Sequence, residues 1–269
     1  MGWARKVTGV LAGAVAVLGA LGTGPAAGIV GGEEARPHRY PFMAGLVDLE
    51  ERRVMCGGAL IGERWVVTAA HCVTGSYGST DRVGVLLGEH DLTSREDSPN
   101  AVLAAPARMV VHPDYDPESQ RNDIALVRLA EPVAVNGDVR PIALPHSFAR
   151  GAFDHTRVEA PGWGATSFGG RTSAVLRTVT LDTMSNPVCG TRGMPQVTPS
   201  QLCTYAPGRD TCQYDSGGPL VHTVARKPYL IGLVSYGKGC ATETPAVNTR
   251  VWSYLNWIER TTGRLPRAS

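Results

Sequence analysis

Short apolar runs separated by turn residues constrain the fold of this 269-residue chain more than any other feature. The clearest runs lie at 57–61, 65–67, 83–87, 124–127, 157–158, 176–181, 219–221, 229–234 and 247–251. They are rich in Val, Leu and Ile, and Gly, Pro, Asn and Asp fall between them, a pattern that is typical of β-strands. The sequence therefore predicts an all-β protein made of two similar halves.

The C-terminal region departs from this pattern. Apolar side chains at Val251, Tyr254, Leu255 and Ile258 fall on one face of a helix. We therefore expect a C-terminal α-helix that closes the fold.

Residues 1–28 are typical of a signal peptide. Arg5 and Lys6 precede an apolar run over 7–21, and small residues follow. A transmembrane anchor is the alternative, but glycines such as Gly13 and Gly19 interrupt the run, which is shorter than the ~20 apolar residues that a span needs. We expect a secreted, extracellular domain over 29–269, with no membrane attachment after the signal is removed and a very short propeptide left open.

The charge of the mature chain is balanced. Of the 26 Lys and Arg residues, two lie within 1–28, which hold no Asp or Glu, so 24 remain against 24 acidic residues. The basic residues are scattered along the chain. The sequence therefore gives no reason to expect nucleic acid or an anionic membrane as a partner.

Six cysteines in an exported chain predict three disulfides, although the sequence alone allows fifteen pairings. A zinc site is the competing interpretation. The chain has no Cys-x-x-Cys pair, and His71 and Cys72 are sequence neighbours whose side chains would diverge. We expect no metal and no cofactor.

Three segments carry residues suited to hydrolysis by a serine: 67–72 with His71, 122–126 with Asp123, and 215–219 with Ser216. Such chemistry needs a base, a group that orients the base, and a nucleophile. Taken singly, His71 fits a buried core histidine, Asp123 a charge at a strand edge, and Ser216 a β-turn. Their order and neighbours together favour a catalytic triad.

An esterase of the α/β-hydrolase type is the rival serine enzyme. Its nucleophile turn needs glycine two residues before the serine, where this chain has Tyr214. Its order of serine, acid and histidine also differs.

Together with 29–32 (Ile-Val-Gly-Gly) and 235–237 (Ser-Tyr-Gly), these segments resemble the chymotrypsin family of trypsin-like secreted serine proteases over nearly the whole mature chain. The resemblance implies two six-stranded antiparallel β-barrels that meet near residue 140, with a C-terminal α-helix. His71 and Asp123 would come from the first barrel and Ser216 from the second.

The resemblance also implies disulfides and an activation ion pair. The disulfides would join Cys56 to Cys72, Cys189 to Cys203, and Cys212 to Cys240. A new amino terminus at Ile29 would pair with Asp215. Gly28 stands where precursors of the family usually have Arg or Lys, and 26–28 (Ala-Ala-Gly) resembles a signal-peptidase site, so export itself would expose Ile29.

In trypsin-like members, the residue at the position of Asp210 forms the floor of the pocket for substrate Arg or Lys. Ser235, Gly237 and Gly239 match the pocket walls. Ala246 replaces a glycine and Asn248 a tyrosine. We therefore expect cleavage after basic residues, in a pocket that is narrowed by one methyl group.

The oxyanion hole would be formed by the backbone N–H groups of Tyr214 and Ser216. The family has glycine in place of Tyr214. Loss of one such donor costs ~10²–10³ in rate, whereas a ring that overhangs the leaving-group side would narrow the range of substrates. The sequence leaves both outcomes open.

The sequence thus predicts a monomeric secreted endopeptidase that acts on proteins or peptides and is open to protein protease inhibitors. Glu89 and Glu96 lie in a segment that binds calcium in some family members, but Pro99 lacks the closing carboxylate, so no metal is expected. The alternative is a secreted binding protein on a protease scaffold, silenced at Tyr214.

Overall fold

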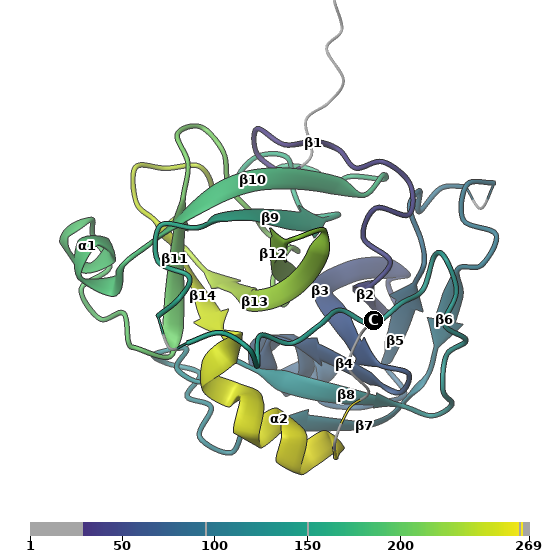
Figure 1. Ribbon diagram of the computed structural model, residues 1–269. Helices are drawn as coiled ribbons and strands as arrows, with labels where there is room; N and C mark the ends of the chain where they lie inside the picture. Colours follow the sequence, from purple (N-terminus) through teal and green to yellow (C-terminus); the bar gives the residue numbers. More distant parts are fainter. Residues whose placement is uncertain (1–28, 95, 150, 264, 266–269) are drawn as a thin grey trace, which may run out of the picture.

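The computed structural model describes residues 29–94, 96–149, 151–263 and 265, so the predicted signal peptide lies outside the described residues. Two antiparallel sheets, each curled into a barrel, stand one above the other, and one longer helix ends the chain (Figure 1). This confirms the all-β class with two barrels and a C-terminal helix.

The first barrel is formed by consecutive strands in the first half of the chain. They are β2 (Met43–Asp48), β3 (Arg53–Gly62), β4 (Trp65–Thr68), β5 (Val83–Leu87), β6 (Val102–Ala104), β7 (Pro106–Val111) and β8 (Ala125–Leu129), paired in the order β6-β5-β2-β3-β4-β8-β7. Only Ala105 separates β6 from β7, so these two strands form one bent segment that joins the two edges of the sheet. The expected six-stranded barrel is therefore present, with one strand divided.

The second barrel closes by hydrogen bonding. Its strands are β9 (Arg157–Gly162), β10 (Arg177–Met184), β11 (Gln201–Tyr205), β12 (Pro219–Val224), β13 (Lys227–Tyr236) and β14 (Ala246–Arg250), and β9 pairs with both β12 and β10. The two-residue strand β1 (Glu33–Glu34) adds to the edge at β10. The N-terminal segment thus belongs to the second sheet, and the expected division near residue 140 stays a prediction.

A shared core joins the barrels. One buried cluster contains Phe42 and Val67 from the first barrel, Leu233 from the second, and Trp257 from the C-terminal helix. This cluster and two further ones, each centred on one barrel, hold the loops between the barrels in fixed positions.

The helices are short. The 3₁₀ turns η1 (Ala70–Val73) and η2 (Gly75–Tyr77) follow β4, and α1 (Asn186–Thr191) lies between β10 and β11. The expected C-terminal helix begins as the 3₁₀ turn η3 (Val251–Tyr254) and continues as α2 (Leu255–Thr262), with its apolar face buried. Among the described residues, no helix is long and apolar enough to cross a membrane.

Candidate active site

His71 and Asp123 are hydrogen-bonded to each other at neighbouring strand ends of the first barrel. His71 lies on η1, directly after β4, and Asp123 lies just before β8, the strand that pairs with β4. Asp123 Oδ2 is 2.8 Å from His71 Nδ1, and Asp123 Oδ1 accepts the His71 backbone N–H at 3.0 Å. Both carboxylate oxygens therefore orient the histidine, which leaves Nε2 available on the other side of the ring.

Two residues of the second barrel hold Asp123 in place. Ser235 donates its hydroxyl to Asp123 Oδ2 at 2.5 Å, and Thr249 donates to the Asp123 backbone carbonyl at 2.6 Å. Asp123 is 1% exposed and therefore has little access to water, so these protein donors supply the hydrogen bonds that water would make to an exposed carboxylate. The second barrel thus fixes the carboxylate of the first.

Ser216 lies in a turn just before β12, pressed against β3. Its backbone carbonyl accepts the N–H of Gly57 at 2.8 Å, and the N–H of Gly217 bonds to the Val234 carbonyl at 2.7 Å. A Cβ on Gly217, which has a φ of +77°, would lie 2.2 Å from the Thr68 hydroxyl oxygen. Glycine is therefore required there for the turn to approach the segment that leads to His71.

The Cys56–Cys72 disulfide ties the strand that contacts Ser216 to the turn that carries His71. Within the described part of the chain, no hydrogen bond joins the Ser216 hydroxyl to the His71 ring. Such bonds are often long or poorly aligned before substrate binds. The arrangement has the parts of a nucleophile, a base and an orienting carboxylate.

Asp215 is a buried carboxyl directly before the serine. Its Oδ1 and Oδ2 accept the backbone N–H groups of Gly164 and Cys212, each at 2.9 Å. The pKa of Asp215 is raised to about 7, mainly by burial; the two N–H groups lower it and the nearby Asp210 adds a smaller increase. A neighbouring cation would reverse this shift.

Ile29 packs near this carboxyl. It is fully buried, and its Cδ1 lies near Gly162, as does the Asp215 carboxylate. Its backbone has a φ of +47°, an unusual conformation for a β-branched residue. In the unprocessed chain its nitrogen belongs to a peptide bond and carries no charge.

Asp210 lines a cavity of about 190 Å³ next to Ser216. Ser235, Gly237, Gly239 and Ala246 also line it, together with Phe168, Thr211, Cys212, Gln213, Val234, Tyr236 and Cys240. Burial raises the pKa of Asp210 to about 6, against the backbone N–H groups of Ala241 and Thr211, which lower it. The structure thus brings Asp210 and the four predicted wall residues into the lining of one cavity, whereas Asn248 lies outside that lining.

The two departures from the family pattern, Ala246 and Asn248, have different consequences. The methyl group of Ala246 faces the space that Gly237 leaves open, so it narrows the cavity. Asn248 is fully buried, and its Nδ2 donates to the Leu202 carbonyl and the Thr204 hydroxyl, away from Asp210. Among the described residues its Oδ1 has no hydrogen-bond partner.

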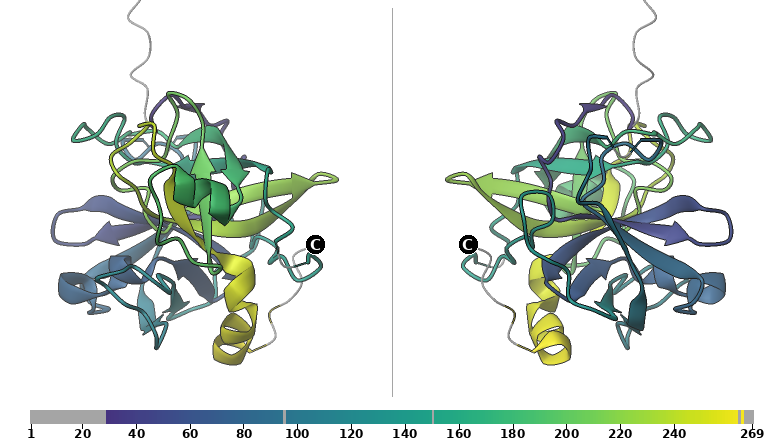
Figure 2. Two further views of the ribbon diagram at one scale, coloured as in Figure 1. Left: turned by 90° about the vertical axis from the view of Figure 1, so that its left-hand side faces the viewer. Right: turned by 90° about the vertical axis from the view of Figure 1, so that its right-hand side faces the viewer.

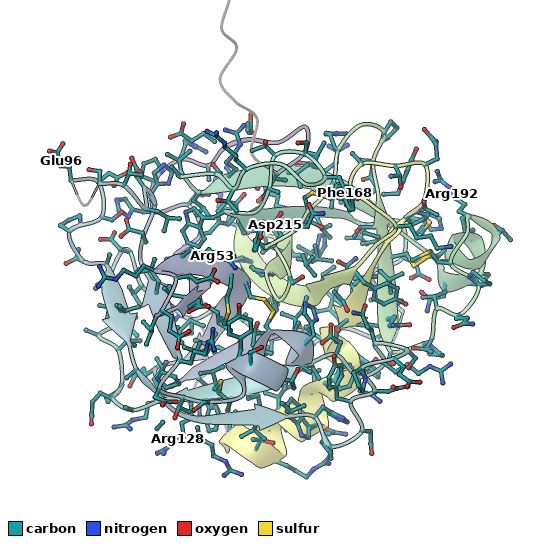
Figure 3. The ribbon with its side chains drawn as sticks, turned by 180° about the vertical axis from the view of Figure 1, so that it is seen from behind. Arg53, Glu96, Arg128, Phe168, Arg192 and Asp215 are labelled. Carbon is teal, nitrogen blue, oxygen red and sulfur yellow. A yellow bond between two sulfur atoms is a disulfide. The ribbon has the colours of Figure 1, made fainter. Side chains whose placement is uncertain are left out.

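Tyr214 adopts a backbone conformation that favours glycine, with a φ of +73°. Its ring is partly exposed, and the guanidinium carbon of Arg53 lies 5.0 Å from the ring centre, within the range of a cation–π contact. Arg53 also pairs with Glu51. Arg53 and Phe168 are seen on either side of Asp215 in Figure 3. The tyrosine thus adopts a glycine-like backbone conformation and adds a partly exposed ring at the surface.

The remaining disulfides brace the second barrel. Cys212 is bonded to Cys240 across the pocket, and Cys189 to Cys203 beside α1, as the resemblance implies. Cys56, His71 and Cys72 lie close enough together to suggest a metal site, but the two sulfurs are bonded to each other and cannot act as thiolate ligands.

A model of the trypsin family matches residues 29–258 of the sequence. The chain belongs to the trypsin family of serine proteases. Trypsin V-B of Rattus norvegicus is 37% identical over 87% of this chain and 89% of its own length, and trypsin of Sus scrofa is 35% identical over 87% and 95%. Venom serine protease 34 of Apis mellifera is 35% identical over 86% of this chain, but the match spans 57% of that protein.

Several residues that shape this trypsin-family site were not predicted. A Cβ on Gly162 or Gly164 would lie 2.1 Å and 2.3 Å from Asp215 atoms, so both glycines are required beside the carboxyl. The sequence 162–164 (Gly-Trp-Gly) carries that signal. Nothing in the sequence indicates the Arg53 contact or the place of Phe168, because both depend on loops meeting in space.

Asp215 should give the unprocessed chain a distinctive dependence of stability on pH. Its pKa in the folded state, about 7, exceeds its unfolded value, so the folded state binds more protons between about pH 4 and pH 7. The free energy of unfolding should therefore fall as pH rises through this range. Asp215→Asn should reduce this fall, leaving the smaller part that Asp210 causes through its own raised pKa, and should stabilise the chain at pH 8 by a few kcal/mol.

Urea unfolding at pH 5 and pH 8 measures this effect on a Ser216→Ala chain that is made without export, so that the residues before Ile29 are retained, and that is refolded with its three disulfides formed. Glu131→Gln, which neutralises an 86% exposed carboxylate, is the control and should leave the pH dependence unchanged. An Asp215→Asn chain that loses stability with pH as the parent does would show that Asp215 is already ionised in the fold.

Proposed function

We propose that this chain is a secreted serine endopeptidase that cleaves after Arg or Lys through an acyl-enzyme on Ser216. The observation that carries the proposal is the arrangement of His71, held by the buried Asp123 carboxylate, beside a cavity that contains both Ser216 and Asp210. Membership of the trypsin family supports it.

The proposed roles follow from these contacts. Ser216 Oγ attacks the scissile carbonyl while His71 Nε2 takes its proton, and His71 then gives that proton to the leaving amine. Asp123 keeps the proton of the ring on Nδ1 and stabilises the imidazolium. Water, activated by the same His71, releases the acyl group from Ser216. The N–H groups of Tyr214 and Ser216 would stabilise the oxyanion.

Asp210 supports a preference for basic side chains. In the free protein its pKa is raised to about 6 because it is buried and, among the described residues, no cation contributes to its ionisation. A guanidinium or ammonium group in the cavity would favour the ionised carboxylate and supply the missing partner. A neutral substrate side chain would leave the charge unpaired. Proteins and peptides with Arg or Lys are therefore the proposed substrates.

Initial rates on matched peptide amides test this preference. The peptides differ only in the residue before the scissile bond, which is Arg, Lys, Phe or Ala. We expect Arg and Lys to exceed Phe by ~10²-fold or more in kcat/KM, since a buried unpaired charge costs several kcal/mol. Asp210→Asn should lose this advantage, and Ser216→Ala should abolish turnover. Faster cleavage after Phe or Ala would show that Asp210 does not select the substrate.

Maturation would complete the site. Removal of residues before Ile29 exposes an α-ammonium group, and its pairing with Asp215 would neutralise the buried carboxyl and order the loop before Ser216. Since Gly28 is not basic, the proposed cut is made during export. The three disulfides fit an oxidising extracellular location. We further propose that the protein is a monomer and that protein protease inhibitors bind to its active site.

N-terminal sequencing of the secreted protein should begin at Ile29. A chain that begins well upstream of Ile29 and becomes active only after a second cut would contradict maturation during export. The control is Gly28→Arg, which replaces the small residue before the proposed cut with a basic one. We expect the signal peptidase to reject this site, so that an N-terminus at Ile29 appears only after treatment with a trypsin-like protease.

The second candidate function is a binding protein without catalysis, and the positive φ of Tyr214 is the observation that favours it. A tyrosine that distorts the loop would remove an oxyanion donor. Covalent labelling of Ser216 by an organophosphonate separates the candidates, because a silent scaffold would not react.

Tyr214→Gly tests what the tyrosine does. Since Tyr214 already has a φ that glycine adopts, we expect the loop to keep its shape and kcat on short amides to change little. Substrates extended on the leaving-group side should gain in kcat/KM because the ring and Arg53 no longer crowd them. A rise of ~10²–10³ for every substrate would instead show that Tyr214 disrupts the oxyanion hole.

A further inference from the structure

A second cavity, of about 500 Å³, is lined by twelve residues of which five are basic and none is acidic. The basic residues are His38, Arg39, Arg140, Arg226 and Lys227. They come from three segments far apart in the sequence. The mature chain as a whole has equal numbers of basic and acidic residues, so this concentration of positive charge is a local feature of the fold.

The cavity lies at the seam of the two barrels. Its walls are the segment 38–42 before β2, the connection 137–143 between the barrels, and the tip of the β12–β13 hairpin. The backbone N–H of Arg140 bonds to the Pro41 carbonyl at 2.8 Å, and that of Leu230 to the Ala143 carbonyl at 2.9 Å. The walls are therefore held together by the backbone before any ligand binds.

The hairpin tip faces away from the proposed active site. Figure 2 shows the β12–β13 and β2–β3 hairpins extending from opposite sides of the molecule, and β2–β3 is the hairpin that carries Arg53 beside Tyr214. The basic cavity is thus separate from the substrate pocket, with which it shares no lining residue.

Neighbouring carboxylates neutralise only part of this charge. His38 Nδ1 lies 2.9 Å from Asp138 Oδ1, and Arg39 pairs with Glu159. Lys227 lies 6.0 Å from the centre of the Tyr229 ring. Both carboxylates contact the segment 38–39, and among the described residues neither forms an ion pair with Arg140 or Arg226.

Two of the cations are available to a ligand. Arg140 and Arg226 are exposed, and among the described residues neither side chain makes an ion pair or hydrogen bond. Arginine forms paired hydrogen bonds with the oxygens of phosphate or sulfate groups. The floor contains Pro41, Phe42 and Pro141, and the volume is in the range of small-molecule sites rather than of a long polymer track.

We propose that this cavity binds a small, multiply charged oxyanion of the polyphosphate type, held by Arg140 and Arg226 with Arg39 and Lys227. Because the cavity walls belong to both barrels, the bound anion would bridge them and stabilise the folded chain.

Isothermal titration of the mature protein with inorganic tripolyphosphate tests the proposal, with thermal unfolding as a second measurement. We expect one anion per chain and a higher Tm in its presence. Arg140→Gln and Arg226→Gln should each weaken binding by about tenfold and reduce the Tm gain, because each removes a charge-assisted contact. Glutamine keeps a long polar side chain, which limits changes in the fold.

Arg128→Gln is the matched control, since Arg128 is an exposed arginine on β8 outside the cavity and should leave affinity unchanged (Figure 3). Three results would overturn the proposal: no binding of tripolyphosphate, equal loss in the Arg128→Gln control, or binding that persists in the Arg140→Gln and Arg226→Gln variants. Binding confined to long polyphosphate chains would also overturn it, because it would indicate a surface track for a polymer.

Discussion

The geometry of the candidate active site depends on a close contact between the backbones of the two barrels. Gly57 in β3 donates its N–H to the Ser216 carbonyl at 2.8 Å, and a Cβ on Gly57 would lie 2.7 Å from Gly218 Cα. No side chain could separate these strands without moving Ser216 away from His71. The distance between the proposed nucleophile and base is therefore set by backbone packing, which is stiffer than any contact between long side chains.

Three buried carboxyls around this contact are partnered in different ways. Asp123 receives hydrogen bonds from the His71 backbone, the His71 ring and Ser235, so its partners are already in place. Asp215 and Asp210 accept hydrogen bonds from backbone N–H groups, but within the described part of the chain no cation affects the pKa of either, and burial raises both pKa values. The fold thus holds two carboxyls ready for a positive charge. The proposed cations, the new amino terminus at Ile29 and the substrate side chain, would each supply what these carboxyls lack.

Local patterns allowed much of the fold to be predicted. Apolar periodicity indicated the strands and the buried face of 251–258, although it did not show that the first turn is 3₁₀. The disulfide partners did not follow from the cysteines alone, because fifteen pairings satisfy the same sequence; the family resemblance supplied them. The segments around His71, Asp123 and Ser216 were recognisable because each carries its chemistry within a few neighbours.

Features that arise only when distant segments meet could not be predicted. Gly162 and Gly164 are needed because a carboxyl from residue 215 packs against them. His38, Arg140 and Arg226 look like scattered surface charges in the sequence, and only the seam between the barrels collects them into one cavity. The balanced net charge of the chain did not indicate this basic cavity, because net charge averages over the whole surface whereas a ligand contacts only one part of it.

At Tyr214, the energetic cost of the backbone conformation can be compared with the stabilisation from the contact between its ring and Arg53. A non-glycine residue held at positive φ costs ~1–3 kcal/mol, whereas a partly exposed cation–π contact such as that with Arg53 contributes ~0.5–1 kcal/mol. The stacking on Arg53 therefore does not offset the backbone strain, and glycine would give a more stable loop. Since the tyrosine does not serve stability, we expect the role of its ring, two residues before Ser216, to lie in the substrate selection proposed above. Gly217 differs from Tyr214 although both have a positive φ, because a side chain at Gly217 would collide with Thr68, whereas the loop has room for the side chain of Tyr214.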